Sequence, residues 1–107
     1  PAQAALRSGE ASEPVSVGNE ADWVTAEDYP LQAMRAGEFG TTTTRLTVGT
    51  NGRVQECAIE QSSGSVLLDD ATCVALTDRA RFEPARDPQG RPVIGTYLKR
   101  VRWTLPE

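Results

Sequence analysis

The dipeptide Asn51-Gly52 constrains the fold of this chain more than any other feature, because it is the strongest short-range signal for a β-hairpin. The stretch before it, 41–48, is rich in β-branched residues and alternates along its length. The stretch after it, 53–61, has the composition of a second strand. The sequence therefore predicts two antiparallel strands joined by a tight turn.

The register of this hairpin follows from the length of its turn. A two-residue turn pairs Leu46 with Cys57. It also pairs Val48 with Gln55. A slip by one residue would turn the apolar sets to opposite faces. We therefore expect Leu46, Cys57 and Ile59 to form the buried face of the hairpin.

Two helices and a third strand complete the predicted pattern. The segment 30–36 begins with a proline and reads as a short helix that Gly37 ends. The segment 67–81 is the strongest helical stretch, with Ser65 or Asp69 as the candidate N-cap. The segment 93–105 alternates as a strand, with one largely apolar face.

The order of these elements fixes a simple topology. The long helix must carry the chain back along the sheet, so 93–105 runs antiparallel to 41–48 and parallel to 53–61. We expect an α+β fold of the split βαβ type, with a three-stranded, mostly antiparallel sheet and both helices on one face. The strand 41–48 then lies in the middle and the last strand lies at an edge.

Composition divides the chain into a tail and a domain. Residues 1–22 contain Leu6, Val15 and Val17 as their only large apolar side chains and read as a flexible linker. Residues 23–107 contain every aromatic residue and form the domain. The alternative is that the two valines add a short strand to the domain. No apolar run approaches the ~20 residues of a membrane span, so any anchor is expected upstream.

Charge and residue types argue against several function classes. The chain has 11 basic and 15 acidic residues, a net charge of −4 that disfavours nucleic acid as a partner. It has no histidine, which removes most hydrolase triads and most zinc sites. We interpret the acidic pairs at helix starts as dipole partners, and the serines of 62–65 as a turn and cap. We expect no enzyme, no catalytic residue, no metal and no cofactor.

The two cysteines, Cys57 and Cys73, lie sixteen positions apart without histidine partners. They are compatible with two buried thiols or with one disulfide, and the redox compartment decides between these.

A series of short motifs runs through 23–107 in a fixed order. The motifs are Trp23, Asp28-Tyr29-Pro30, Gly37-x-x-Gly40, Asn51-Gly52-Arg53-Val54, Ser62-Ser63-Gly64, Arg81-Phe82-Glu83-Pro84-Ala85, Gly90-x-Pro92-Val93 and Val101-x-Trp103-x-Leu105. This series resembles the C-terminal domain of TonB-family energy transducers. The two-cysteine variant is most similar to TonB-like proteins of alphaproteobacteria. The structural positions of the motifs are Trp23, Tyr29, Pro30, Gly40, Asn51, Gly52, Phe82 and Pro84.

The resemblance implies a periplasmic module with two partners. An upstream membrane helix would tether it to the inner membrane and to a proton-channel complex there. The domain itself would bind the TonB box of an outer-membrane TonB-dependent transporter and transmit energy from the proton-motive force to it. In an oxidising periplasm, Cys57 and Cys73 should form a disulfide. Glu27-Asp28 stands here where the family often has Gln- and Pro-rich residues.

In the family the TonB box binds by β-strand addition to the last strand, which implies a partner-binding set in this chain. The set is Gly95, Thr96, Tyr97, Leu98, Lys99, Arg100, Val101, Arg102 and Trp103. The alternative is a structural or oligomerising module of another cell-envelope protein, without energy transduction. The sequence leaves open whether the working form is a monomer or a homodimer, and which transporter and nutrient it serves.

Overall fold

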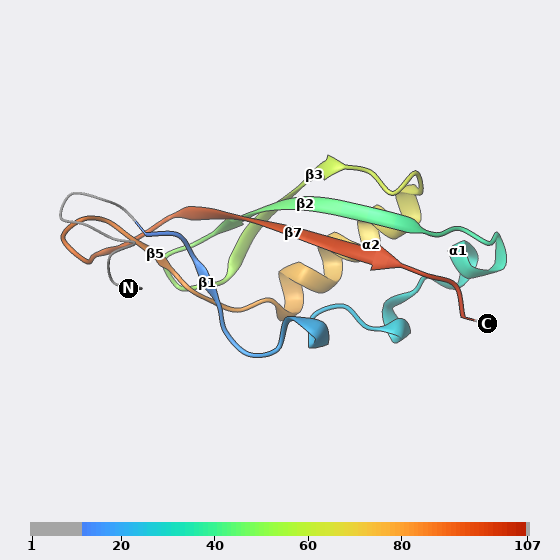
Figure 1. Ribbon diagram of the computed structural model, residues 1–107, viewed down its shortest axis with the longest axis horizontal. Helices are drawn as coiled ribbons and strands as arrows, with labels where there is room; N and C mark the ends of the chain where they lie inside the picture. The colour runs from blue at the N-terminus through green and yellow to red at the C-terminus, as the bar shows by residue number, and fades with distance from the viewer. Residues whose placement is uncertain (1–11, 107) are drawn as a thin grey trace, which may run out of the picture.

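A computed structural model describes residues 12–106 and has a three-stranded sheet at its centre (Figure 1). The middle strand, β2 (Gly40–Val48), lies between β3 (Val54–Gln61) and β7 (Gly95–Trp103), and both pairings are antiparallel. The strand β2 alternates buried and more exposed side chains, as a strand with one covered face does. The predicted α+β class and the central position of 41–48 are confirmed.

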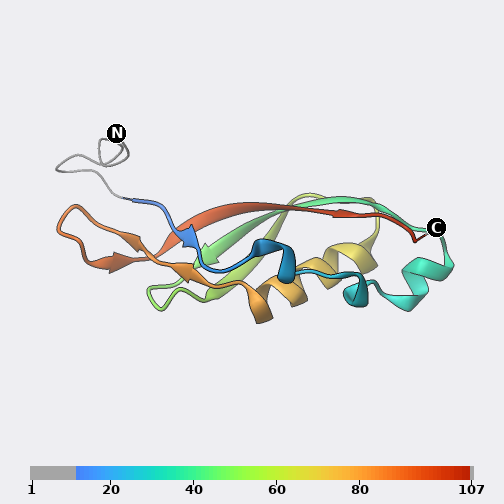
Figure 2. The same ribbon diagram turned by 60° about the horizontal axis from the view of Figure 1, so that its bottom comes forward.

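The helices lie below the sheet in Figure 2 and form the second layer of the fold. The short α1 (Leu31–Arg35) begins after Pro30, and α2 (Val66–Arg79) begins after Ser65, whose hydroxyl accepts a hydrogen bond from the Leu68 amide. Two 3-10 turns, η2 (Glu20–Asp22) and η3 (Ala26–Asp28), precede α1. No helix among residues 12–106 is long and apolar enough to cross a membrane.

The predicted last strand is divided in the structure. β6 (Pro92–Val93) pairs with β5 (Ala85–Arg86), whereas β7 pairs with β2. Ile94 separates the two strands. The hydrogen bond from the Asp87 amide to the Arg91 carbonyl closes the turn that pairs β6 with β5. The uniform strand expected over 93–105 is therefore shorter, at 95–103.

The hairpin register agrees with the prediction over most of its length. Leu46 pairs with Cys57, but Val48 pairs with Val54 rather than with Gln55, because the register shifts after Thr47. Gln55 is the extra residue of this bulge. At the turn, Gly52 has a φ of +79°, and a Cβ atom there would lie 2.0 Å from the Phe82 carbonyl oxygen. Only glycine allows this approach of the two backbones.

The prediction of the buried face is wrong for one residue, Ile59. Ile59 is 40% exposed, whereas Leu46 is fully buried and Cys57 is partly buried. The strand β3 lies at an edge of the sheet, so the Ile59 side chain is open on its outer side within the described residues.

The prediction of a flexible linker over 1–22 needs correction for its described part, 12–22; residues 1–11 lie outside the described residues. β1 (Val15–Ser16) pairs with β4 (Phe82–Glu83), and the Val17 amide donates to the Arg81 carbonyl over 2.9 Å. Pro14 is buried. We call residues 12–22 the N-terminal strap. Main-chain hydrogen bonds hold it, and composition does not reveal these.

The core lies between the sheet and α2. Its aromatic part has two groups: Phe82 contacts both Trp23 and Tyr97, with ring centroids 5.3 and 4.8 Å away, and Tyr29 meets Trp103 edge-on at 5.3 Å. Such tilted and edge-on pairs are the favoured arrangement of aromatic rings. The second group lies at the end of β7 where α1 and the C-terminus are also found (Figure 1).

Candidate functional site

The outer edge of β7 carries no strand within residues 12–106. The Thr44 hydroxyl donates to the Lys99 carbonyl over 2.9 Å, so the main-chain groups of Lys99 face β2. Main-chain groups alternate between the two sides of a strand. Those of the neighbours Leu98 and Arg100 therefore point away from the sheet.

A second contact gives the same alternation. The amide of Gly49, directly after β2, donates to the Arg53 carbonyl, directly before β3. The main-chain groups of the odd-numbered residues of β2 therefore face β3, and those of its even-numbered residues face β7. The unpaired side of β7 thus presents N–H and C=O groups from every second residue of the predicted partner-binding set. These residues are Thr96, Leu98, Arg100 and Arg102.

The side chains of these same residues cover the face of the sheet that points away from α2. All four are exposed, and Leu98 is 59% exposed. Within the part of the chain that the structure describes, neither Arg100 nor Arg102 takes part in an ion pair. The edge is therefore a row of main-chain donors and acceptors with uncompensated positive charge beside it.

The inner side of the edge strand is held in place by polar contacts. The Lys99 ammonium lies 2.8 Å from one oxygen of Glu20, and the Tyr97 hydroxyl donates to the other over 2.6 Å. Lys99 also lies over the Trp23 ring, 5.8 Å from its centroid. Burial raises the pKa of Glu20, but the hydrogen bonds from Lys99 and Tyr97 outweigh it and lower the value to about 2. The carboxylate is thus ionised at neutral pH.

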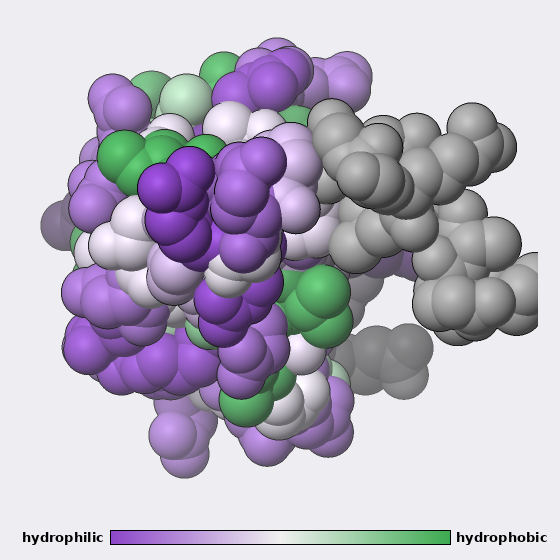
Figure 3. Space-filling model, turned by 90° about the vertical axis from the view of Figure 1, so that its left-hand side faces the viewer, coloured by the Kyte–Doolittle hydropathy of each residue, from purple (hydrophilic) through white to green (hydrophobic). Residues whose placement is uncertain are grey.

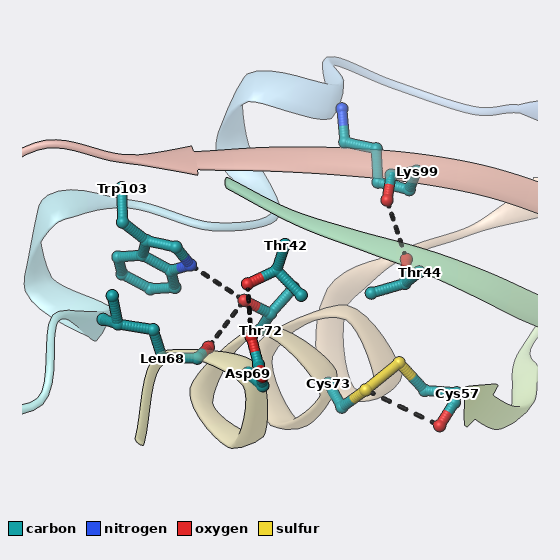
Figure 4. Close-up of a disulfide and its surroundings, with 9 residues drawn as sticks. All are labelled: Thr42, Thr44, Cys57, Leu68, Asp69, Thr72, Cys73, Lys99 and Trp103. Atoms are coloured by element: carbon teal, nitrogen blue, oxygen red, sulfur yellow. Dashed lines mark hydrogen bonds between the residues drawn. A yellow bond between two sulfur atoms is a disulfide. The ribbon is translucent and has the colours of Figure 1, made fainter. Parts of the chain in front are cut away.

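Every strand of the sheet is joined to α2 by at least one specific bond (Figure 4). On β3, Cys57 forms a disulfide with Cys73, with the Cα atoms 5.7 Å apart. On β7, the Trp103 indole donates to the Thr72 hydroxyl over 2.8 Å. On β2, the Thr42 hydroxyl donates to Asp69 over 2.9 Å. These bonds keep the edge strand rigid relative to the helix layer.

Asp69 has a role that the sequence did not reveal. It is buried and accepts hydrogen bonds from Ser62, Ser63 and Thr42, so it fastens the loop before α2, while Ser65 caps the helix. Burial raises the pKa of Asp69, but these hydrogen bonds have the larger effect, so the pKa lies below its ordinary value. Within residues 12–106 no cluster of acidic or cysteine side chains could hold a metal ion.

A family model described as the Gram-negative bacterial TonB protein C-terminal matches residues 25–105. The chain belongs to the TonB C-terminal domain family. No curated protein sequence matches the chain. TonB C-terminal domains are periplasmic, belong to a non-enzymatic, transport-associated family and interact with outer-membrane transporters.

The motif residues of the TonB domain occupy structural positions. Three of them, Trp23, Tyr29 and Phe82, are buried in the core. Pro30 precedes α1, and Pro84 separates β4 from β5. The remaining motif residues are Asn51 and Gly52 in the hairpin turn and Gly40 at the start of β2.

Proposed function

We propose that this chain is the peptide-binding domain of a TonB-type energy transducer, and that it binds the TonB box of an outer-membrane transporter as an added strand on β7. The unpaired edge of β7 is the observation that carries this proposal. An extended peptide finds N–H and C=O groups there at the repeat it needs, because every second residue points outward.

The contacts around β7 support a role in transmitting force. An added strand would pull on β7, which is bonded to β2, to α2 through Trp103 and to the N-terminal strap through Lys99. A segment upstream of the strap would tether the domain to the inner membrane and to its proton-channel complex. A pull on that segment enters the domain through the strap and reaches β7 through Glu20.

The charge of the edge favours a peptide over a second copy of the chain. Two copies paired edge to edge along β7 would bring the arginines of both strands together, and like charges across strands are destabilising. An acidic or neutral peptide meets no such penalty. Oligomerisation through β7 would instead support the alternative function, a structural module without energy transduction.

The experiment is a titration of the 15N-labelled domain with a synthetic peptide carrying the N-terminal TonB box of a transporter, followed by backbone amide shifts. We expect shifts concentrated between Gly95 and Trp103. Leu98→Pro removes an N–H that points away from the sheet and should abolish binding, whereas the matched control Leu98→Ala keeps that N–H and should bind. Val101 is unsuitable for this test because its N–H faces β2.

Three outcomes would contradict the proposal. Shifts confined to the Asn51-Gly52 turn or to α2 would mean that a different surface binds the peptide. Unchanged binding by Leu98→Pro would exclude strand addition at this residue. Self-association in place of peptide binding, seen by sedimentation, would favour the structural module. Binding should also weaken with added salt, because Arg100 and Arg102 are exposed.

A further inference from the structure

A hollow of about 360 Å³ lies beside the C-terminal end of β7. Its lining includes the consecutive residues 101–106, which end β7 and follow it, and residues 24–26, which lead into η3 and begin it. Consecutive residues of a strand point to opposite faces. A lining that includes Val101, Arg102 and Trp103 together therefore runs along the main-chain edge of β7, where the proposed peptide would lie.

The hollow is lined largely by apolar side chains that the core only partly covers. Val24, Met34 and Leu105 pack against the buried core, yet each is only partly buried and each lines the hollow. Incompletely covered apolar area of this kind gains free energy when another apolar group covers it.

The other end of the edge differs. A second hollow at the start of β7 has apolar side chains such as Ile94 and Leu98 in its lining, but the charged Glu13 and Arg45 line it too. Figure 3 shows that this end of the molecule is mostly hydrophilic on its described surface, with apolar atoms in small separate patches. Pro14 also packs close to Gly95 there, since a Cβ atom on Gly95 would lie 3.0 Å from the proline ring. The apolar hollow at 101–106 is therefore the better-suited receptor for a side chain.

The geometry of strand addition brings one peptide side chain to this hollow. On an added strand, alternate side chains point toward the helix layer, about 6.6 Å apart. An inward side chain that lies beside Val101–Trp103 reaches the space between β7 and residues 24–26. Its two neighbours in the peptide point to the opposite face, where the side chains of Arg100 and Arg102 lie exposed.

We propose that this hollow is a subsite for one large apolar side chain of the bound peptide, which rests on the strand addition proposed above. The occupant is a residue such as Leu, Ile or Phe, and acidic or neutral residues flank it. Charge complementarity with Arg100 and Arg102 selects the flanking residues, and the apolar hollow selects the residue between them. Together they set the register of the peptide along β7.

The test pairs a peptide scan with a variant that fills the hollow. Each inward position of the TonB-box peptide is made Leu or Ala in turn, and affinities are measured by fluorescence anisotropy. At one position, Leu should bind the wild-type domain about tenfold more tightly than Ala, as burial of a large aliphatic side chain requires. Ala26→Leu should remove this preference and leave the affinity for the Ala peptide unchanged. The exposed alanine Ala21 of η2 lies outside the lining, so Ala21→Leu is the matched control and should change neither affinity.

Met34→Ala provides a second variant that enlarges the hollow instead of filling it. It should move the preference at the same peptide position from Leu toward Phe. If Leu98→Pro abolishes binding but neither hollow variant alters any preference, the subsite is excluded and strand addition stands. If the wild-type domain shows no peptide-induced shifts along β7, both the subsite and the proposed function are excluded.

Discussion

Glu20 and Lys99, 79 positions apart in the chain, form an ion pair with 2.8 Å between the carboxylate and the ammonium. The pair connects the N-terminal strap to the inner side of the edge strand. Both side chains are mostly buried, with 28% and 21% of their surface exposed. Because Tyr97 donates to the same carboxylate, one glutamate holds two neighbouring inward residues of β7.

Removal of the Glu20 charge should destabilise the domain. In Glu20→Gln the amide cannot replace both charge-assisted bonds, and Lys99 keeps its charge without a partner. We expect a loss of about 1–2 kcal/mol in the free energy of unfolding, measured by urea denaturation. Asp22→Asn, in the same 3-10 turn but exposed, is the control and should change stability by less than about 0.5 kcal/mol. Equal stability of the two variants would show that the ion pair contributes nothing.

Stability should also fall in acid, because several carboxylates have lowered pKa values in the folded state, and for two of them the value falls to about 2. Glu20 titrates at about 2 instead of 4.5. Hydrogen bonds from Arg79 outweigh burial and lower the pKa of Asp28 from 3.8 to about 2. A lowered folded-state pKa stabilises the fold above the unfolded-state value, and this stabilisation is lost as the pH falls through the folded-state value.

The loss should therefore extend from about pH 5 to about pH 2. The measurement of this loss is the melting temperature at each pH in this range. It is compared between the wild type and the double variant Glu20→Gln/Asp28→Asn. The double variant should start lower at pH 7 and change less on acidification, so that the two curves converge near pH 2. Parallel curves over the whole range would show that Glu20 and Asp28 do not cause the loss of stability in acid.

The strap leads to a third prediction, which is opposite to the expectation from composition. A chain that begins at Trp23 lacks β1, the Val17–Arg81 main-chain bond, the buried Pro14 and Glu20. Compared with a chain that begins at Ser12, it should lose about 2 kcal/mol, which is roughly 10 °C in melting temperature for a domain of this size. Calorimetry of the two chains gives the two melting temperatures. Equal melting temperatures would show that the strap is only a tail.

The topology was predictable from the sequence because local signals and connection rules determine it. Asn51-Gly52 sets the hairpin, and a single long helix can return the chain only to the far side of β2. The bulge at Gln55 was not predictable. It occurs where the Phe82 amide donates to Gly52, a contact between segments that are distant in the sequence.

The candidate site was predictable only in part, for the same reason. Strand alternation gives the inward and outward side chains of β7, but the direction of its main-chain groups follows from the Thr44–Lys99 contact between paired strands. The hollow is lined by residues 24–26 and 101–106, and no local pattern relates these two segments. The role of Glu20 depends on a contact of the same long range.

The final prediction concerns the disulfide between Cys57 and Cys73, which joins the edge strand β3 to the middle of α2. Its closed loop spans a sequence separation of 16, and a loop of this length stabilises a fold by about 3 kcal/mol on the chain-entropy model. Reduction should therefore lower the urea midpoint markedly. Cys57→Ala/Cys73→Ala should unfold at the midpoint of the reduced protein and should not respond to reductant. Intact mass after denaturation with an alkylating agent gives the bonding state directly. Two added alkyl groups without reductant would show that the thiols are not joined.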